Sequence, residues 1–316
     1  MPPRCNRFTQ PPECRKVHLV IGASGFLGAH VYQRLLDRGA HVHGTCGRHH
    51  RPGLQAIDLL DPQATARYLI SLRPEPDVII WCAKRNHEND DERALNENGL
   101  RNLTCSVPDA TRLIFVSTDG LLPGTGAPHG EDVRPVPFSS DSAIARYTNG
   151  KLWAEQWLQN SSPLARTTTI VRTGMIYGRA ASGEWDGRTA AVLNDFALGQ
   201  PFPRADNLMR TFVHVEDLAS ALCELAIDFV PGILHAGPEH GESHYTFARA
   251  VGRAWSLPVH LLRPHRIPFA DVEEREIRLD TRLDTSFLLS RLKTRFHSVE
   301  QAFTLAAGRR DHPSST

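Results

Sequence analysis

The stretch that decides the fold is VHLVI followed directly by GASGFLG, which together run from Val17 to Gly28. The first five residues are mostly apolar, as in a short buried strand, and apolar residues recur at helical spacing from Phe26 onward. A glycine turn between strand and helix lets backbone N–H groups at the helix N-terminus approach a pyrophosphate, which the helix dipole also favours. The spacing is G-x-x-G-x-x-G, and a turn of this kind can also be purely structural, so that alternative stays open.

The first half of the chain alternates short apolar runs with helix-compatible segments. Besides residues 17–21, strands are predicted over residues 41–45, 55–59, 77–83, 112–117 and 167–174. Helices are predicted over residues 62–72, 92–105 and 142–159, and a surface loop rich in proline and glycine over residues 123–137. Because strands that alternate with helices indicate βαβ units, we expect an α/β fold with a parallel, right-handed, doubly wound sheet.

The second half of the chain has weaker periodicity and predicts a smaller lobe. Residues 211–219 read as a strand, a turn and a helix, which we expect to rejoin the main sheet. The predicted organisation has two main parts. A dinucleotide-binding domain covers residues 16–177 and also includes about 211–232, and a substrate-binding lobe covers residues 178–210 and 233–307. Flexible segments are expected at both ends, over residues 1–15 and 308–316.

The length and composition fit a soluble globular protein, which we expect to stay in the cytoplasm. The chain has 316 residues, of which 41% are hydrophobic, and a formal net charge of +1, so nothing points to nucleic acid or to a membrane surface as a partner. No apolar run approaches the ~20 residues of a membrane span, and the first fifteen residues lack the apolar centre of a signal peptide. The six cysteines form no C-x-x-C pair, the sixteen histidines match no metal-ligand spacing, and we therefore expect free thiols and no metal site.

Tyr147 and Lys151 are four residues apart, so on a helix they lie on the same face, one turn from each other. A lysine ammonium near a phenol stabilises the phenolate and lowers the phenol pKa from ~10, which makes the tyrosine a usable general acid or base. The same lysine can bind the ribose hydroxyls of a cofactor. Such a pair is common on solvated helix faces, but here it follows a predicted strand whose end carries polar residues, and this position favours the catalytic interpretation.

That strand ends in Ser117-Thr118-Asp119. Residues at the carboxyl ends of parallel strands line the crevice in which such sheets bind ligands, so the Thr118 hydroxyl is expected to bond the substrate oxygen that Tyr147 protonates. The alternative is that Thr118 caps the end of the strand and Asp119 begins a turn.

The cofactor preference follows from the charges after the second predicted strand. An NAD site usually has a carboxylate there for the ribose hydroxyls, whereas a 2′-phosphate is repelled by that carboxylate and prefers arginine. Residues 45–51 read TCGRHHR and contain no acid, so we expect NADP, with Arg48 as the phosphate partner and NAD as the second possibility. The alternative is that these basic residues form a solvated loop.

Motifs spread over residues 17–290 carry a resemblance to a known family. They are Gly22-x-x-Gly25-x-x-Gly28, Asp58-Leu59, Asn96-x-x-Gly99-x-x-Asn102, Ser117-Thr118-Asp119, Glu131-Asp132, Tyr147-x-x-x-Lys151, Arg172 with Tyr177-Gly178, RTFVHVED at 210–217, and Leu283-Asp284-Thr285-Ser286. In this order they resemble the extended short-chain dehydrogenases/reductases of the NAD-dependent epimerase/dehydratase superfamily, and within them the dTDP-4-dehydrorhamnose reductase-like branch. The resemblance implies a Rossmann-type sheet with a smaller C-terminal substrate-binding lobe.

The resemblance also implies a role for particular residues. Thr118, Tyr147 and Lys151 would form the catalytic set, with Tyr147 as the acid/base and Lys151 as its electrostatic partner. Cofactor contacts are implied for Gly22, Ser24, Gly25, Phe26, Leu27 and Gly28 at the pyrophosphate, for Asp58 and Leu59 at the adenine end, for Ala83 beneath the cofactor, and for Tyr147 and Lys151. Substrate contacts are expected at Arg210, at Asp119, and at Lys84, which departs from the small residues that relatives have at this point.

These residues predict an NAD(P)H-dependent reductase of a keto group on a nucleotide-linked sugar or a related substrate, with hydride from the nicotinamide and a proton from Tyr147. One alternative is an epimerase or dehydratase that retains its cofactor. A dehydratase needs a carboxylate near the substrate, and Asp119, next to Thr118, keeps this option open. Another is a non-catalytic, NADP-binding regulatory subunit, a role that some relatives adopt after losing the catalytic residues. A homodimer through the tyrosine-bearing helix would fit Trp153 and Trp157, if these are not simply core residues.

Overall fold

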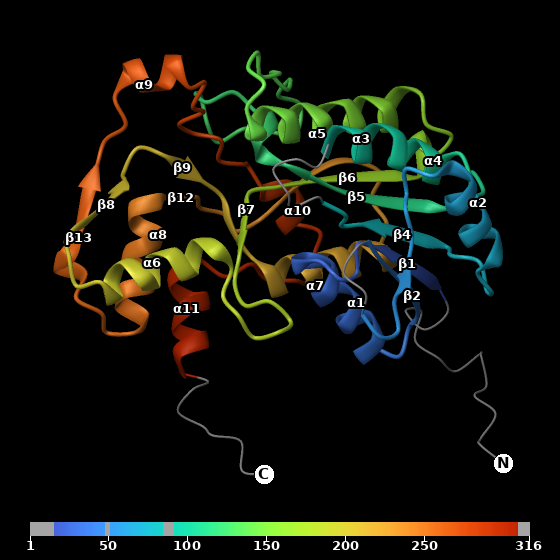
Figure 1. The fold of residues 1–316 in the computed structure, drawn as a ribbon, viewed down its shortest axis with the longest axis horizontal. Helices are drawn as coiled ribbons and strands as arrows, with labels where there is room; N and C mark the ends of the chain where they lie inside the picture. The colour runs from blue at the N-terminus through green and yellow to red at the C-terminus, as the bar shows by residue number, and fades with distance from the viewer. Residues whose placement is uncertain (1–15, 48–50, 85–91, 309–316) are drawn as a thin grey trace, which may run out of the picture. The chain divides into compact units, whose positions relative to one another are not determined.

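The computed structural model describes residues 16–47, 51–84 and 92–308. Within these ranges the main sheet contains seven strands in the order β11-β6-β5-β4-β1-β2-β3 (Figure 1). Their bounds are β1 Val17–Ile21, β2 His41–Cys46, β3 Gln55–Ala56, β4 Val78–Trp81, β5 Arg112–Thr118, β6 Thr168–Thr173 and β11 Gly232–Ala236. β1 pairs in parallel with β2 and β4, β2 with β3, and β4 with β5. The predicted doubly wound α/β fold is confirmed, since the strand order reverses direction beside β1 as in Rossmann-type sheets.

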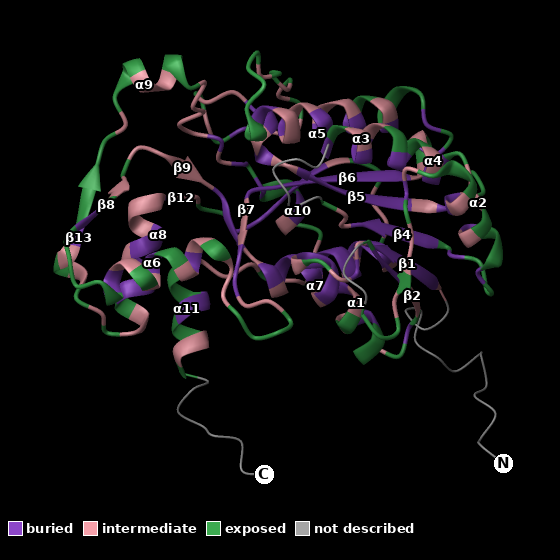
Figure 2. Cartoon of the chain, viewed as in Figure 1, coloured by how far each residue is buried: buried purple, intermediate pink, exposed green. Residues whose placement is uncertain are grey.

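Helices cover both faces of this sheet (Figure 1). Those on one side are α2 Pro62–Ser71, α3 Glu92–Ala94, α4 Leu100–Thr104 and α5 Ala143–Asn160, and those on the other are α1 Phe26–Asp37 and α7 Val215–Ile227. The central strands β1, β4, β5 and β6 are almost entirely buried, while the helices are buried mainly where they face the sheet (Figure 2). This two-sided cover explains why the strands read as continuous apolar runs rather than as alternating ones.

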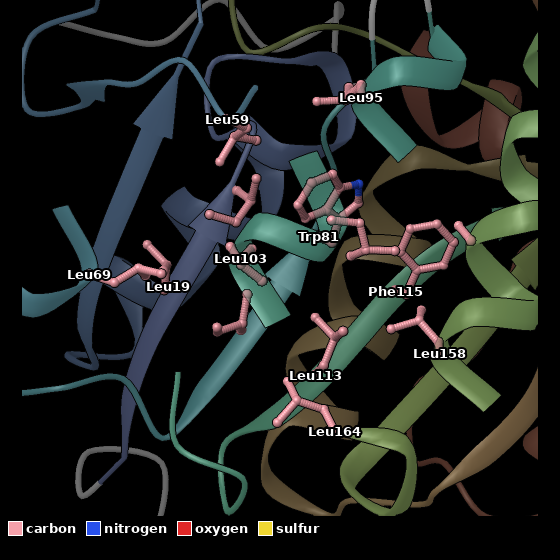
Figure 3. Packing of buried hydrophobic residues seen from close by; sticks show 14 of the residues in the cluster. Leu19, Leu59, Leu69, Trp81, Leu95, Leu103, Leu113, Phe115, Leu158 and Leu164 are labelled. Carbon is pink, nitrogen blue, oxygen red and sulfur yellow. The ribbon is translucent and has the colours of Figure 1, made fainter. Parts of the chain in front are cut away.

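One hydrophobic core of the sheet lies on the side of α2, α4 and α5 (Figure 3). Strand residues Leu19, Trp81 and Phe115 pack there against Leu103 of α4 and Leu158 of α5. Because successive strand residues point to opposite faces, the neighbours of these strand residues face α1 and α7 instead. Burying one such leucine side chain contributes roughly 1.5–3 kcal/mol to the fold.

Two predicted elements are shorter than expected. The predicted helix over residues 92–105 is divided by a π-helical stretch, Leu95–Gly99, in which the Asn96 side chain donates to the Glu92 carbonyl oxygen at 2.9 Å. A side chain that bonds to the backbone in this way competes with the regular helical ladder. The predicted strand over residues 55–59 ends at Ala56, because the Asp58 carboxylate accepts a hydrogen bond from the Leu60 N–H at 3.0 Å and forms a turn.

The chain divides into two compact units. The first comprises the chain up to Ser117 together with Asp141–Val171 and Ala219–Ile233, and the second comprises Thr118–Ser140, Arg172–Leu218 and the chain from Leu234 onward. The second unit contains pairs of short strands: β7 Met175–Tyr177 with β10 Phe212–His214, β8 Phe202–Ala205 with β13 Leu262–His265, and β9 Met209–Arg210 with β12 Glu242–Ser243. Its helices are α6 Gly187–Ala197, α8 His244–Ala254, α9 Phe269–Glu274, α10 Ser286–Leu289 and α11 Val299–Gly308. The domain bounds expected from the sequence stay a prediction.

The strand predicted within residues 211–219 exists, but its expected place in the main sheet is wrong. β10 pairs with β7, and the seventh strand of the main sheet is β11. The physical reason lies at Gly174, just before β7, where a Cβ would collide with the Thr211 carbonyl oxygen. The absence of that Cβ lets the two chain segments approach closely enough to pair with each other.

The second unit has a core of its own, which is rich in aromatic rings. The ring of Phe303 on α11 lies 5.2 Å from that of Tyr177 and 5.5 Å from that of Phe247. Rings at such separations add stabilisation beyond the area that they bury. None of the helices in the described part of the chain has the length and apolarity needed to cross a membrane.

Three histidines, of which His18 and His235 are buried and His244 is half-buried, should make the fold sensitive to acid. Burial lowers the pKa of His18, and it lowers the pKa of His235 to about 4 and that of His244 to about 3. The unfolded chain takes up these protons near pH 6.5, whereas the folded chain takes them up only at lower pH. The free energy of unfolding, measured by urea denaturation, should therefore fall below about pH 6.5, by on the order of 1 kcal/mol per pH unit for each histidine.

His18→Leu tests this expectation, because it removes one such group from a fully buried position. The free energy of unfolding of this variant should depend less steeply on pH than that of the wild type. The matched control is His265→Leu, since His265 is exposed and its replacement should leave the slope unchanged. A His18→Leu slope equal to that of the wild type would contradict the argument.

Candidate active site

The glycine turn joins β1 to α1 and packs against the end of β4. Gly22 has a φ of 83°, and a Cβ at this position would lie 2.8 Å from the Ala83 Cα atom. A Cβ on Gly28 would collide with the Gly22 carbonyl oxygen. The Gly22 N–H donates to Thr45 Oγ1 at 3.1 Å, which ties the turn to β2. Thr45 was not identified from the sequence, although its position at the end of a predicted strand was a usable signal.

The N-terminus of α1 is open to an anion. Gly25 precedes the helix and is exposed, no side chain caps the helix, and its first turn contains no acidic residue. The remaining predicted pyrophosphate contacts, Ser24, Phe26 and Leu27, lie at this turn, and Leu27 is buried. Uncapped N–H groups at the positive end of a helix dipole suit a phosphate group, and the cradle that the glycines leave fits the pyrophosphate of a dinucleotide.

The residues predicted for the adenine end are held by a neighbouring helix. The Leu59 carbonyl oxygen accepts a hydrogen bond from Asn102 Nδ2 at 2.9 Å, while Asp58 is exposed. Asp58 also lines a groove of about 800 Å³ formed by β2, β3 and α2, whereas the glycine turn and Tyr147 do not line it. Arg48, the predicted phosphate partner, lies outside the described residues.

Tyr147 and Lys151 lie one turn apart on α5, as their spacing predicts. The Lys151 side chain is buried, and its ammonium donates to the Val116 carbonyl oxygen at 3.0 Å, above the ring of Phe115. Lys84 follows Ala83 at the end of β4, and its Nζ atom lies 5.0 Å from the centre of the Tyr147 ring. The first unit therefore brings the tyrosine and two lysines together.

Burial lowers the pKa of Lys151 to about 8. The carboxylate of Glu92 on α3 acts most strongly in the opposite direction, the positive charge of Lys84 lowers this pKa further, and Glu155 on α5 raises it more weakly than Glu92 does. Asn96 donates to Glu92 Oε1 at 3.2 Å and so helps to hold it. Lys151 thus keeps its charge at neutral pH and loses part of it near pH 8.

The sequence analysis missed Glu92 and Glu155. Glu155 is buried, lies one turn beyond Lys151, and accepts a hydrogen bond from Ser117 Oγ at 2.5 Å. The spacing of four residues between Lys151 and Glu155 was an available signal. No local signal singled out Glu92, whose place near Lys151 depends on the close packing of α3 against Gly150 of α5.

The second unit contains the remaining predicted residues, Thr118 and Asp119. Thr118 Oγ1 accepts a hydrogen bond from the Gly120 N–H at 3.1 Å and so caps a single 3₁₀ turn, Asp119–Leu121. Asp119 is 5% exposed, and its carboxylate accepts a hydrogen bond from Thr281 Oγ1 at 2.7 Å. Burial raises the pKa of Asp119, while Arg210 acts in the opposite direction. The capping role considered for Thr118 is present, and its catalytic role stays a prediction.

Arg210 makes its observed hydrogen bonds to backbone carbonyl groups. Its guanidinium donates to the carbonyl oxygens of Met209 at 2.6 Å, Leu279 at 3.1 Å and Arg278 at 2.7 Å. Burial lowers its pKa. These bonds join β9 to the segment that follows α9, and substrate binding by Arg210 stays a prediction.

Arg278, which no sequence motif singled out, supports the turn after Thr118. It donates to the carbonyl oxygens of Gly120, Leu122 and Val136, and its guanidinium lies 3.8 Å from the centre of the Phe138 ring. Among the residues that the structure describes, no group of three or more His, Cys, Asp or Glu side chains is placed to hold a metal ion.

The profile of the NAD dependent epimerase/dehydratase family matches residues 18–231, which is more than half of the chain and includes the glycine turn, Tyr147 and Lys151. The chain belongs to this family. The resemblance stated from the sequence motifs is thereby confirmed at the level of the superfamily.

Solved structures show the same fold. A hypothetical dTDP-4-dehydrorhamnose reductase from Sulfolobus tokodaii superposes with a TM-score of 0.73 and 23% identity, covering 89% of this chain and 96% of that one. A dTDP-4-dehydrorhamnose reductase from Bacillus anthracis in complex with NADP gives a TM-score of 0.73 and 18% identity, covering 92% and 96%. A curated relative of a different kind is methionine adenosyltransferase 2 subunit beta of Bos taurus, 27% identical over 278 residues, 80% of this chain and 79% of the relative.

Two alanine variants should separate the role of the glycine turn in packing from its expected role in binding the pyrophosphate of a dinucleotide. In Gly28→Ala the new Cβ collides with the Gly22 carbonyl oxygen, so the free energy of unfolding should fall by about 1–3 kcal/mol. In Gly25→Ala the φ of −80° is ordinary and the nearest atom lies 3.2 Å away, so stability should change by less than about 1 kcal/mol.

Gly25→Ala should nevertheless weaken the binding of NADPH or NADH about tenfold or more, because its Cβ occupies the approach to the pyrophosphate. Thermal unfolding and fluorescence titration of the nicotinamide measure the two effects separately. Wild-type affinity in Gly25→Ala would mean that the dinucleotide does not bind at this turn.

Proposed function

We propose that the protein is an NADP(H)-dependent reductase of a keto group on a nucleotide-linked sugar or a related substrate. The observation that carries the proposal is the pair Tyr147 and Lys151, with Lys151 buried and charged at neutral pH, in the same unit as an uncapped glycine cradle. The similarity of the fold to dTDP-4-dehydrorhamnose reductases, one of them in complex with NADP, supports this choice.

The chemistry divides between the cofactor and the chain. A bound nicotinamide supplies the hydride that reaches the carbonyl carbon. Tyr147 gives its phenolic proton to the carbonyl oxygen, and the ammonium of Lys151 stabilises the phenolate that results. The Thr118 hydroxyl, in this proposal, donates a hydrogen bond to the same oxygen while negative charge develops on it. In the reverse direction Tyr147 must begin as phenolate in order to accept the proton of the alcohol.

The cofactor contacts follow the same assignment. The glycine turn would bind the pyrophosphate through backbone N–H groups, Asp58 and Leu59 would bind the adenine end, and Ala83 would lie beneath the cofactor. We assign Arg48 to the 2′-phosphate of NADP, because residues 45–51 contain arginine and no acid. NAD remains the second candidate cofactor, in keeping with the description of the family.

A regulatory subunit is the second candidate function. Its support is the likeness to proteins named as subunit beta of methionine adenosyltransferase 2. The reductase is preferred, because a chain that only binds a partner has no need for a tyrosine and a buried lysine one turn apart beside a dinucleotide cradle. An epimerase or dehydratase ranks third. Asp119, the carboxylate that kept this option open, is 5% exposed and accepts a hydrogen bond from Thr281.

We also propose a homodimer formed through α5. Trp153 and Trp157 stack on this helix with ring centres 5.9 Å apart, and the guanidinium of Arg101 on α4 lies 4.9 Å from the ring of Trp157. Both tryptophans are only partly buried within the chain, so a partner would cover apolar surface there.

Oxidation of NADPH in the presence of a panel of nucleotide 4-ketosugars tests the reductase. The wild type should consume NADPH in proportion to the product formed, and Tyr147→Phe should lower kcat about 10²–10⁴-fold, because the phenolic proton is lost while the ring remains. NADPH binding by the Phe variant serves as the control and should stay close to that of the wild type.

Turnover that survives Tyr147→Phe would contradict the assigned role of the tyrosine. A cofactor that stays bound through purification and is not consumed would favour the epimerase or dehydratase. An altered rate of a methionine adenosyltransferase without any consumption of NADPH would favour the regulatory subunit.

A further inference from the structure

Lys84 follows the end of β4 that packs against the glycine turn. The end of β4 packs so closely on the glycine turn that a Cβ on Gly22 would lie 2.8 Å from Ala83 Cα. Lys84 is the next residue, and its ammonium lies 5.0 Å from the centre of the Tyr147 ring. The backbone contact between Gly22 and Ala83 therefore fixes the backbone position from which the Lys84 side chain extends.

Tyr147 thus has two lysines close to it, and their surroundings differ. Lys151, one helical turn away, is buried, and its ammonium is bonded to the Val116 carbonyl oxygen. Lys84 is exposed, so it does not bear the loss of hydration that acts on Lys151. The two positive charges also repel each other, because Lys84 acts to lower the pKa of Lys151.

The other titratable groups that act on this pair come from three elements. Glu92 of α3 and Glu155 of α5 favour the charged form of Lys151, whereas Cys82 at the end of β4 would do so only as a thiolate. Burial raises the pKa of Cys82 to about 12, so its thiol is neutral over the working range of pH. Near pH 8 and above, Lys151 loses part of its charge, and its support of a phenolate weakens.

We propose that Lys84 is a second positioning lysine, which acts on Tyr147 from the end of β4 and stabilises its phenolate together with Lys151. The inference rests on the proposed function, because it takes Tyr147 to be the residue that transfers the proton. It adds that the proton transfer depends on two lysines from different elements. The second of them occupies a position where the resemblance leads one to expect a small, uncharged residue.

The sign of the effect differs between the two directions of the reaction. A positive charge near a phenol favours the phenolate, so removing the charge of Lys84 should raise the pKa of Tyr147, by about one unit at this distance. Oxidation of an alcohol needs the phenolate, and at neutral pH it should slow about tenfold. Reduction needs the protonated phenol and should not slow, and its decline at high pH should move upward by about one unit. A general loss of structure would slow both directions alike.

The first experiment follows the ionisation of Tyr147 without any substrate. The absorbance change of tyrosine ionisation is recorded against pH for the wild type and for Tyr147→Phe, and the difference isolates Tyr147 among the five tyrosines. The background is reduced because burial raises the pKa of Tyr68 to about 12 and that of Tyr177 well above its usual value. In Lys84→Met the isolated titration should move to higher pH by about one unit.

Two control variants complete the design. Lys84→Arg keeps the charge and should leave the titration of Tyr147 close to its wild-type position. Lys293→Met removes a charge from an exposed lysine of the second unit and should not move the titration. A Tyr147 titration that is the same in Lys84→Met and in the wild type would overturn the inference, whatever the enzyme activity.

The pH dependence of kcat in both directions, at saturating substrate, forms the second experiment, with the substrate found in the ketosugar panel. A substrate contact of Lys84 would change KM and leave this comparison intact. Slower oxidation at neutral pH without slower reduction, rescued by Lys84→Arg, is the expected result, and equal slowing of both directions would overturn the inference. If no substrate is turned over, the proposed function fails, while the titration still decides the effect of Lys84 on Tyr147.

Discussion

The first unit depends on one close contact between backbone segments, that of the glycine turn with the end of β4. A side chain on Gly22 would prevent it, since its Cβ would lie 2.8 Å from Ala83 Cα. The same turn leads into the N-terminus of α1, which no side chain caps and which suits a phosphate group. It also sets the end of β4, from which Lys84 reaches the ring of Tyr147. The glycine turn and the surroundings of Tyr147 therefore depend on the same backbone contact.

The buried lysine is the electrostatic counterpart of this contact. Placing an ammonium ion away from water is unfavourable, and the chain offsets the loss of hydration with the Val116 carbonyl oxygen and with the carboxylates of Glu92 and Glu155. The result is a lysine that is charged at neutral pH but close to titration. In a purely structural role such a group is hard to explain, whereas it has a use beside the tyrosine that we propose as the proton donor.

Much of the fold could be read from local patterns. The bounds of β1 agree with the predicted strand, and α5 and β6 begin and end within one residue of their predictions. The predictions failed where a contact between distant segments decided the outcome. Gly174 allows β7 to pair with β10 through its contact with Thr211, so residues 212–214 do not enter the main sheet. The side chain of Asn96 interrupts the helix predicted over residues 92–105.

The sequence by itself determined the glycine turn and the pairing of Tyr147 with Lys151, because both depend on residues only three or four positions apart, whose relation is set by local backbone geometry. The tertiary structure alone decided that Lys84 lies over Tyr147, that Glu92 acts on Lys151, and that Arg278 supports the turn after Thr118. In each of these contacts the two residues are separated by at least 59 and at most 158 positions along the chain. No spacing along the chain encodes them, since they exist only after separate elements have packed together.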